Sequence, residues 1–238
     1  TPLYSSAASD VYKRQHDGFP LGDLVCFQAK HNEANGEDNR DGHNANYSWN
    51  NGVEGQSDDE NVSAAREADA RALIATLFAS RGSILMTAGD EFGHSQQGNN
   101  NAYAQDNAIT WRNWDDLNQD RLDYTRAWAE LRKTSSLLGR VAFLEDEDGS
   151  ANPDQVSWLG SNGQPMTPAE WEDPDRNSFM MVLGPAGKRL TIVFNRSHQA
   201  LRCVLPASQG LWCPASPGAS VENPVPPRSV VCWQEMPG

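Results

Sequence analysis

The spacing of apolar side chains changes along the chain, and each change predicts a different kind of element. Residues 70–78 place apolar side chains on one face of a helix, with Asp58-Asp59-Glu60 before them and Gly82 after them. Residues 83–87 form a short apolar run that ends at Ala88-Gly89-Asp90-Glu91, which predicts a buried strand. This order of helix, turn and strand is typical of a parallel α/β fold, whose ligand sites lie at the carboxyl ends of the strands.

The remaining apolar segments predict two more helices and an antiparallel β-domain. Residues 18–27 favour a short helical turn near Pro20, and residues 122–135 favour a longer helix. After Gly139 the period becomes that of strands, which we expect at 155–159, 179–183, 190–195, 201–205, 211–213 and 229–233. Gly184-Pro185-Ala186-Gly187 predicts a hairpin turn between two of them. Residues 140–238 are therefore expected to form an antiparallel β-sandwich domain.

Two polar loops interrupt the apolar pattern, and their side chains suit either turns or a carbohydrate. Residues 30–63 and 98–107 are rich in Asn and Gly and contain few aliphatic side chains. Asn supplies both a donor and an acceptor for sugar hydroxyls, and aromatic rings can stack on pyranose rings. The candidate sugar ligands are Asn99, Asn100, Asn101, Tyr103 and Trp49, with further aromatic faces at Tyr47 and Trp111. Asn and Gly also build turns, so composition alone leaves both interpretations open.

The charge balance excludes some classes of partner. The 238 residues include 32 acidic and 19 basic side chains, which gives a formal net charge of −13. Nucleic acid and anionic membrane surfaces are therefore disfavoured, since both need a basic patch. The four Cys contain no CxxC pair, and no apolar run is long enough for a membrane span. We expect a cytoplasmic protein that needs no cofactor and no metal.

The first residues differ in character from the rest of the chain. The chain opens at Thr1 rather than Met and continues through a stretch rich in Ser and Ala. Residues 10–15 match the translated end of a common transposase sequencing adapter. We interpret residues 1–15 as a non-native segment, and a genuine flexible linker is the alternative.

His16-Asp17 is the first candidate for chemistry. A carboxylate beside an imidazole can bind sugar hydroxyls and stabilise developing positive charge, although a surface turn can hold the same pair. Asp90-Glu91 could be a catalytic pair, but adjacent residues at a strand end point in different directions, which favours a structural network that anchors the loops. Glu37, Asp38 and Asp41 match no calcium-loop spacing and are interpreted as a solvated face.

Four motifs in a fixed order resemble those of a known family. They are His16-Asp17-Gly18-Phe19-Pro20-Leu21, Lys30-His31-Asn32-Glu33-Ala34-Asn35-Gly36-Glu37, Ala88-Gly89-Asp90-Glu91-Phe92-Gly93-His94 and Gly98-Asn99-Asn100-Asn101-Ala102-Tyr103. Together they resemble the bacterial glycogen debranching enzymes of the isoamylase type, in the α-amylase superfamily of glycoside hydrolases. The resemblance implies that residues 16–139 are the C-terminal part of a catalytic (β/α)8 TIM barrel, with 83–87 as its eighth strand.

The same resemblance implies a function and two roles. The family cleaves α-1,6-glucosidic branch linkages in glycogen catabolism, so the implied partner is an α-glucan such as glycogen or limit dextrin. Asp17 matches the family's third carboxylate, a transition-state stabiliser, and His16 matches a residue that binds the same sugar. The family's nucleophile and general acid precede this motif, so we expect a truncated and inactive enzyme. An isoamylase, a trehalose-pathway debranching enzyme or a non-catalytic glucan-binding fragment are alternatives, and branch-length preference and oligomeric state stay open.

Overall fold

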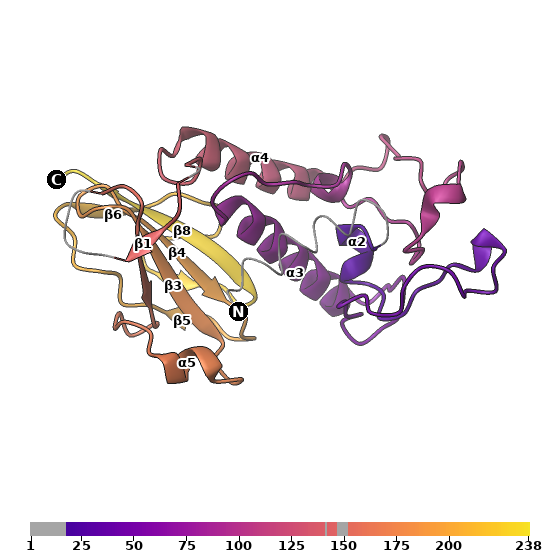
Figure 1. The fold of residues 1–238 in the computed structure, drawn as a ribbon, viewed down its shortest axis with the longest axis horizontal. Coiled ribbons are helices and arrows are strands. Elements are labelled where there is room, and N and C mark those ends of the chain that lie inside the picture. Colours follow the sequence, from indigo (N-terminus) through magenta and orange to yellow (C-terminus); the bar gives the residue numbers. More distant parts are fainter. Residues whose placement is uncertain (1–17, 141, 147–151) are drawn as a thin grey trace. The chain divides into compact units, whose positions relative to one another are not determined.

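The computed structural model describes residues 18–140, 142–146 and 152–238 (Figure 1). Contacts between residues divide the chain into two compact units. The first unit contains Thr1–Leu77 and Ile84–Thr125, and the second contains Phe78–Ser83 and Arg126–Gly238. The expected domain limits, 1–15, 16–139 and 140–238, stay a prediction, because compact units of one chain need not be the domains of a complete protein.

Helices separated by long loops make up the first unit. The segments are α2 (Leu21–Leu24), η1 (Glu33–Asn35), α3 (Glu60–Ala79), η2 (Asp90–Phe92), η3 (Ala102–Ala104) and α4 (Gln119–Thr134), of which α3 and α4 end in the second unit. Buried apolar side chains of this unit include Leu24, Val25, Ile74 and Phe92. The helices expected at 18–27, 70–78 and 122–135 are confirmed by α2, α3 and α4. In the part of the chain that the structure describes, no helix combines the length and the apolar character that a membrane span requires.

The long loop after α2 has little regular structure but fixed partners. The backbone N–H groups of Trp49 and Gly55 donate to the carbonyls of Leu24 and Cys26 at 3.2 and 2.9 Å. Carbonyls at the end of a helix have no partner within it, so these bonds satisfy groups that α2 leaves open. The loop is therefore held against the end of that helix.

The strand expected at residues 83–87 is absent, and that prediction is wrong. The segment forms no strand, and the Leu85 side chain is 43% exposed. A strand is defined by hydrogen bonds to a neighbouring strand, and within residues 18–140, 142–146 and 152–238 no segment pairs with this one. The apolar run therefore stays extended without a ladder.

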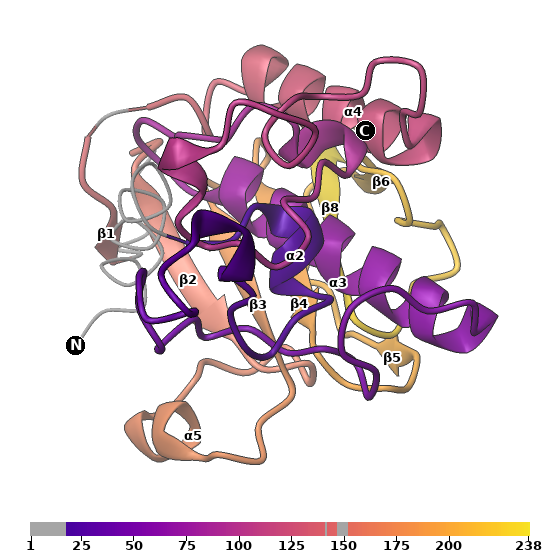
Figure 2. The ribbon, with the colours of Figure 1, turned by 90° about the vertical axis from the view of Figure 1, so that its right-hand side faces the viewer.

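A six-stranded sheet in the order β1-β2-β3-β4-β8-β6 forms the centre of the second unit. Its strands are β1 (Glu145–Asp146), β2 (Gln155–Leu159), β3 (Ser178–Leu183), β4 (Leu190–Asn195), β6 (Leu211–Pro214) and β8 (Ser229–Met236), and β5 (Leu201–Arg202) pairs separately with β7 (Pro224–Val225). Neighbours are antiparallel except β1 and β2. The predicted hairpin turn at 184–187 joins β3 to β4. Between β2 and β3, helix α5 (Pro168–Glu172) lies beyond one end of these strands (Figure 2).

One face of the large sheet packs against the β5–β7 pair. The buried cluster between them contains Leu159, Met180, Val182, Val193, Cys203, Val225, Val231 and Trp233. Residues alternate between the two faces of a strand, so Phe179 and Met181 of β3 lie on the opposite face. The antiparallel β prediction is confirmed for this unit, with a second layer of only two short strands.

The end of α3 belongs to the second unit, where Arg132 of α4 binds to it. The Arg132 guanidinium donates to the carbonyl of Phe78 at 2.9 Å and also to the carbonyls of Ser80 and Gly82. The carbonyl of Phe78 lies in the last turn of α3 and the other two follow the helix, so all three need partners outside it. No pattern in the sequence predicted this contact.

Candidate functional site

Two polar loops of the first unit, one on each side of α3 in the sequence, meet through paired Asn side chains. The amide of Asn32 donates to Asn100 Oδ1 at 2.9 Å, and the backbone N–H of Asn100 donates to Asn32 Oδ1 at 3.0 Å. The Asn99 amide donates to Asn35 Oδ1 at 2.9 Å. Asn32, Asn99 and Asn100 are almost completely buried, so their polar groups need such partners. The pairs fix one loop against the other.

Asp41 adds a carboxylate to this network. Its Oδ2 accepts bonds from the amides of Asn35 at 2.6 Å and Asn101 at 2.9 Å, and the bond from Asn35 is the largest cause of its lowered pKa. The next residue, Gly42, has a φ of +66°, and a Cβ there would lie 2.3 Å from Asn100 Oδ1. Position 42 therefore favours glycine both for its backbone conformation and for space.

The three candidate Asn ligands lie inside this network, whereas Tyr103 lies outside it. Asn99, Asn100 and Asn101 are at most 8% exposed, and Tyr103, in η3 directly after them, is 82% exposed. The amide of Asn100 donates to Asn46 Oδ1 at 2.6 Å, which is a further bond within the protein. The network therefore supports the start of η3, and direct sugar binding by the three Asn residues stays a prediction.

Trp49 takes part in a different set of contacts. Its Nε1 donates to Asp69 Oδ2, on α3, at 2.9 Å, and Asn51 Nδ2 donates to the same oxygen at 3.2 Å. The bond to Asp69 fixes the orientation of Trp49, and because the residue is 37% exposed, part of it reaches solvent. A ring held in this way suits stacking on a sugar ring.

Asp23, which the sequence pattern did not single out, holds the start of the second polar loop. The side chain is fully buried in α2, and its carboxylate accepts bonds from the Ser95 hydroxyl at 2.5 Å and the N–H groups of Gln96 at 2.8 Å and Gly98 at 3.1 Å. Burial raises the pKa of Asp23 to about 6 in spite of these bonds. This carboxylate ties α2 to the segment that leads into the Asn network.

Asp90 has the structural role expected for it. Its Oδ1 accepts a bond from the N–H of Leu21, the first residue of α2, at 2.7 Å. The first amides of a helix have no partner within the helix and favour a negative charge, so Asp90 caps α2. Glu91 instead accepts a bond from the N–H of Gly89 at 2.8 Å, so the two adjacent carboxylates serve different partners.

A cavity of about 260 Å³ lies beside the contact between α3 and α4 in the first unit. Its lining includes Cys26, Arg66, Glu67 and Arg121. Burial raises the pKa of the Cys26 thiol, so this thiol is not an activated nucleophile. Among the residues described, no group of three or more His, Cys, Asp or Glu side chains fits a metal ion.

Curated relatives cover almost the whole chain. A glycogen debranching enzyme of Enterobacter sp. (strain 638) is 41% identical over 233 residues, which are 92% of this chain and 34% of that protein. The chain is a homologue of glycogen debranching enzymes. A glycogen debranching enzyme of Salmonella typhi is also 41% identical, over 97% of this chain and 35% of that protein. The chain thus spans about a third of the length of the curated relatives it matches, and no protein-family model matches it.

Solved structures share the fold. A pullulanase from Bacillus acidopullulyticus aligns with a TM-score of 0.51 and 18% identity, over 75% of this chain and 21% of that chain. A pullulanase from Anoxybacillus sp. LM18-11 aligns with a TM-score of 0.50 and 14% identity, over 73% of this chain and 24% of that chain. The resemblance to debranching enzymes that the four motifs indicate is confirmed by the curated relatives, while these structures show the fold alone.

The His-Asp pair of the first debranching-enzyme motif, His16 and Asp17, lies outside the described residues. The next residue is described, and its contact is informative. The N–H of Gly18 donates to the carbonyl of Asn100 at 2.7 Å. The chain directly after Asp17 is therefore bound to the loop that carries Asn99, Asn100 and Asn101.

Proposed function

We propose that this chain is part of a glycogen debranching glycoside hydrolase that cleaves α-1,6-glucosidic branch linkages of glycogen or limit dextrin. The observation that carries the proposal is the 41% identity, over 92% of the chain, with a protein named glycogen debranching enzyme. An isoamylase, a trehalose-pathway debranching enzyme and a non-catalytic glucan-binding protein are the alternatives. We also propose a cytoplasmic location and a reaction without cofactor or metal.

We propose that Asp17 stabilises the transition state and that His16 binds the same sugar. The bond between Gly18 and Asn100 supports this, because it ties the residue after Asp17 to residues 98–103, which also resemble a motif of the family. A retaining glycosidase also needs a nucleophile and a general acid about 5 to 5.5 Å apart. In the family that the motifs resemble, both groups precede the motif that matches His16-Asp17.

We propose that Tyr103 and Trp49 contact the glucan with their rings. Tyr103 is 82% exposed, and Trp49 is fixed by Asp69 with part of its ring in solvent. The Trp49 ring, which its bond to Asp69 orients, loses little conformational freedom when a sugar stacks on it, and the exposed Tyr103 ring offers a second apolar face. We propose Asn99, Asn100 and Asn101 as further substrate-binding residues, which also position Tyr103 through η3.

We propose that residues 16–139 complete a (β/α)8 barrel in a longer protein, followed by a β-sandwich domain at 140–238. The order of α3, the extended segment at 83–87 and α4 supports this, since such a barrel repeats helix and strand.

The test is Asp17→Asn in a protein of the full length of the relatives, assayed on limit dextrin. We expect kcat to fall on the order of 10²- to 10³-fold with the fold intact, since a group that stabilises transition-state charge acts on the chemical step. Asp116→Asn, which changes an exposed carboxylate of the first unit, should keep the wild-type kcat. An unchanged kcat in Asp17→Asn would contradict the role of Asp17, and a wild-type protein that releases no linear chains would contradict the proposed reaction.

A further inference from the structure

The sheet face that is turned away from the β5–β7 pair carries a row of aromatic rings. Phe179 of β3 and Phe194 of β4 are directly paired, and their rings stack with centroids 4.6 Å apart. The ring centroid of Trp158, on β2, lies 6.0 Å from that of Phe179. The ring centroid of Trp171, on α5, lies 5.5 Å from that of Phe179 and 5.6 Å from that of Trp158. Trp171 is 40% exposed, so the row reaches the surface at this ring.

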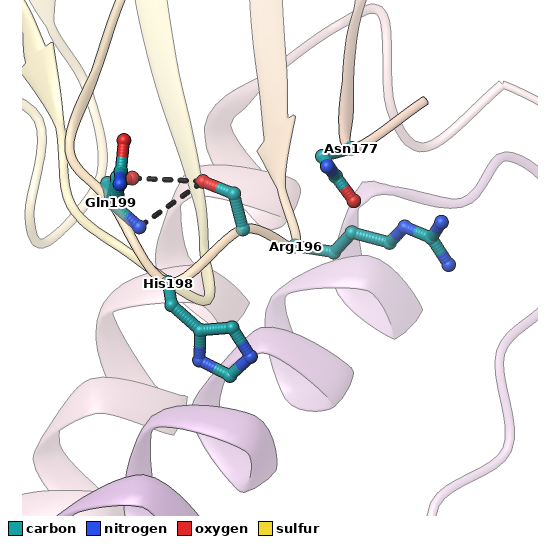
Figure 3. A pocket seen from close by; sticks show the side chains of 5 residues that line it. Asn177, Arg196, His198 and Gln199 are labelled. Atoms are coloured by element: carbon teal, nitrogen blue, oxygen red, sulfur yellow. Dashed lines mark hydrogen bonds between the residues drawn. The ribbon is translucent and has the colours of Figure 1, made fainter. Parts of the chain in front are cut away.

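The row continues into a polar hollow at the end of the strands. Asn177 and Arg196 are each two residues from a ring of the stacked pair, and the N–H of Arg196 donates to the carbonyl of Asn177 at 2.9 Å. Asn177 directly precedes β3 and Arg196 directly follows β4, so this bond extends the pairing of the two strands by one residue. The two residues line a hollow of about 550 Å³ together with Ser197, His198 and Gln199 (Figure 3).

The turn that forms this hollow is fixed by a buried side chain beneath it. Asn195 is 2% exposed, and its Oδ1 accepts bonds from the N–H and the hydroxyl of Ser197 at 3.1 and 2.7 Å. Its amide donates to the carbonyls of Gln199 at 2.9 Å and Pro226 at 2.8 Å. The turn is therefore held in one conformation while His198 and Gln199 stay exposed.

We propose that this hollow and the aromatic row form an additional glucan-binding site on the second unit, made of residues to which the debranching-enzyme resemblance assigns no role. The proposal rests on the proposed function for its ligand, an α-glucan segment. Amide, imidazole and guanidinium groups can bond to sugar hydroxyls, and Trp171 can stack on a pyranose ring. A site already in its binding conformation loses little entropy on binding, which favours even a weak ligand.

The lining favours a neutral sugar over a cation. The side chains that line the hollow include no carboxylate, so it offers nothing that attracts a cation. The Nε and Nη2 of Arg196 donate to the carbonyls of Arg176 and Pro174, so two of its five N–H groups are already used. The other N–H groups of Arg196, the imidazole and two amides are spread over the lining, which suits dispersed hydroxyl groups.

The experiment compares the 238-residue chain with the double variant His198→Ala/Gln199→Ala and with Trp171→Ala. Binding is measured by electrophoretic retardation in gels that contain glycogen and by calorimetric titration with maltoheptaose. Each lost hydrogen bond should weaken binding about fivefold, so the double variant, which loses two, should bind on the order of 25-fold more weakly. Gln164→Ala, which changes an exposed residue of the same unit, is the matched control and should bind like the wild type.

Several outcomes would overturn the proposal. It fails if the wild-type chain binds neither glycogen nor maltoheptaose. It also fails if both variants bind as tightly as Gln164→Ala and unfold at the same urea concentration as that control. Competition by inorganic phosphate at comparable concentration would show an anion site instead. Hydrolysis of limit dextrin is measured separately, with a full-length protein. If that protein hydrolyses limit dextrin but the 238-residue chain binds no glucan, only this inference is contradicted. If the chain binds glucan but the full-length protein does not hydrolyse limit dextrin, only the proposed function is contradicted.

Discussion

Asp23 shows how one buried residue can be both structurally useful and costly. Its carboxylate organises a loop through bonds from Ser95, Gln96 and Gly98, but burying a charge costs free energy that these bonds offset only in part. Its pKa is therefore raised to about 6. Since the unfolded value is about 3.9, the folded state binds a proton more readily between these values. Its contribution to stability is fully present below about pH 4 and is lost as the pH rises through about 6.

Asp23→Asn should remove this pH dependence and keep the fold. The Asn oxygen can accept the bonds from Gln96 and Gly98, and its amide can donate to the Ser95 hydroxyl. The free energy of unfolding, measured in urea between about pH 4 and about pH 7.5, should fall for the wild type by on the order of 3 kcal/mol more than for the variant. Asp23→Ala leaves the three donors unpaired and should be destabilised across the whole range. If the Asp23→Asn variant keeps the wild-type slope, another group is responsible for the titration.

At the scale of elements, Glu67 joins α3 to α4 in the first unit. It accepts bonds from Arg121 Nη2 at 2.5 Å and from Arg71 Nε at 2.7 Å. Burial alone would raise the pKa of Glu67, but the contacts with Arg121 and then Arg71 outweigh it, so the pKa is lowered. This carboxylate therefore contributes stability above its unfolded pKa of about 4.3 and loses it as the pH falls through the folded value.

Glu67→Gln should destabilise the chain more than a charge change on the surface does. Arg121 is 7% exposed, so the substitution leaves a buried guanidinium without its counter-charge, which costs about 3 kcal/mol or more. Urea unfolding at neutral pH measures the difference. Glu130→Gln on α4 removes an exposed pair with Lys133 and should change stability by less than about 1 kcal/mol. Equal effects of the two variants would mean that the Glu67 contact is no stronger than a surface pair.

Elements were predictable where their information is local. The strands β3, β4 and β8 contain short runs of mostly apolar residues, and such a run of strand length is typical of a buried strand. The strand expected at 83–87 has the same local character but forms no ladder, because its partner is not specified by its own residues. Helix α5 was missed although Thr167 and Glu170 form a capping box, a pattern that can be read from the sequence.

The candidate site of the whole molecule was predictable in its composition but not in its geometry. Asn99, Asn100, Asn101 and Tyr103 were singled out by type, yet nothing in their order distinguishes three buried residues from one exposed ring. Asp23 gave no signal, because its donors come from residues more than seventy positions away. Spatial contacts of this kind also decide which segments form a compact unit. The limits of the two units therefore differ from the boundary that the change of period suggests at Gly139.

Limited proteolysis of the 238-residue chain tests where that boundary lies. We expect the first cuts in the exposed loop at 36–59, which has few backbone ladders to protect it, and a resistant product that begins ahead of α3 and includes the large sheet. The product should keep α3 because Arg132 binds the carbonyls of Phe78, Ser80 and Gly82. In Arg132→Ala these carbonyls lose their partner, so mass measurement should show new cuts at 78–85, whereas Lys133→Ala, which changes an exposed neighbour, should give the wild-type pattern. A resistant product that begins near residue 140 in the wild type would show instead that the change of sequence period marks the folding boundary.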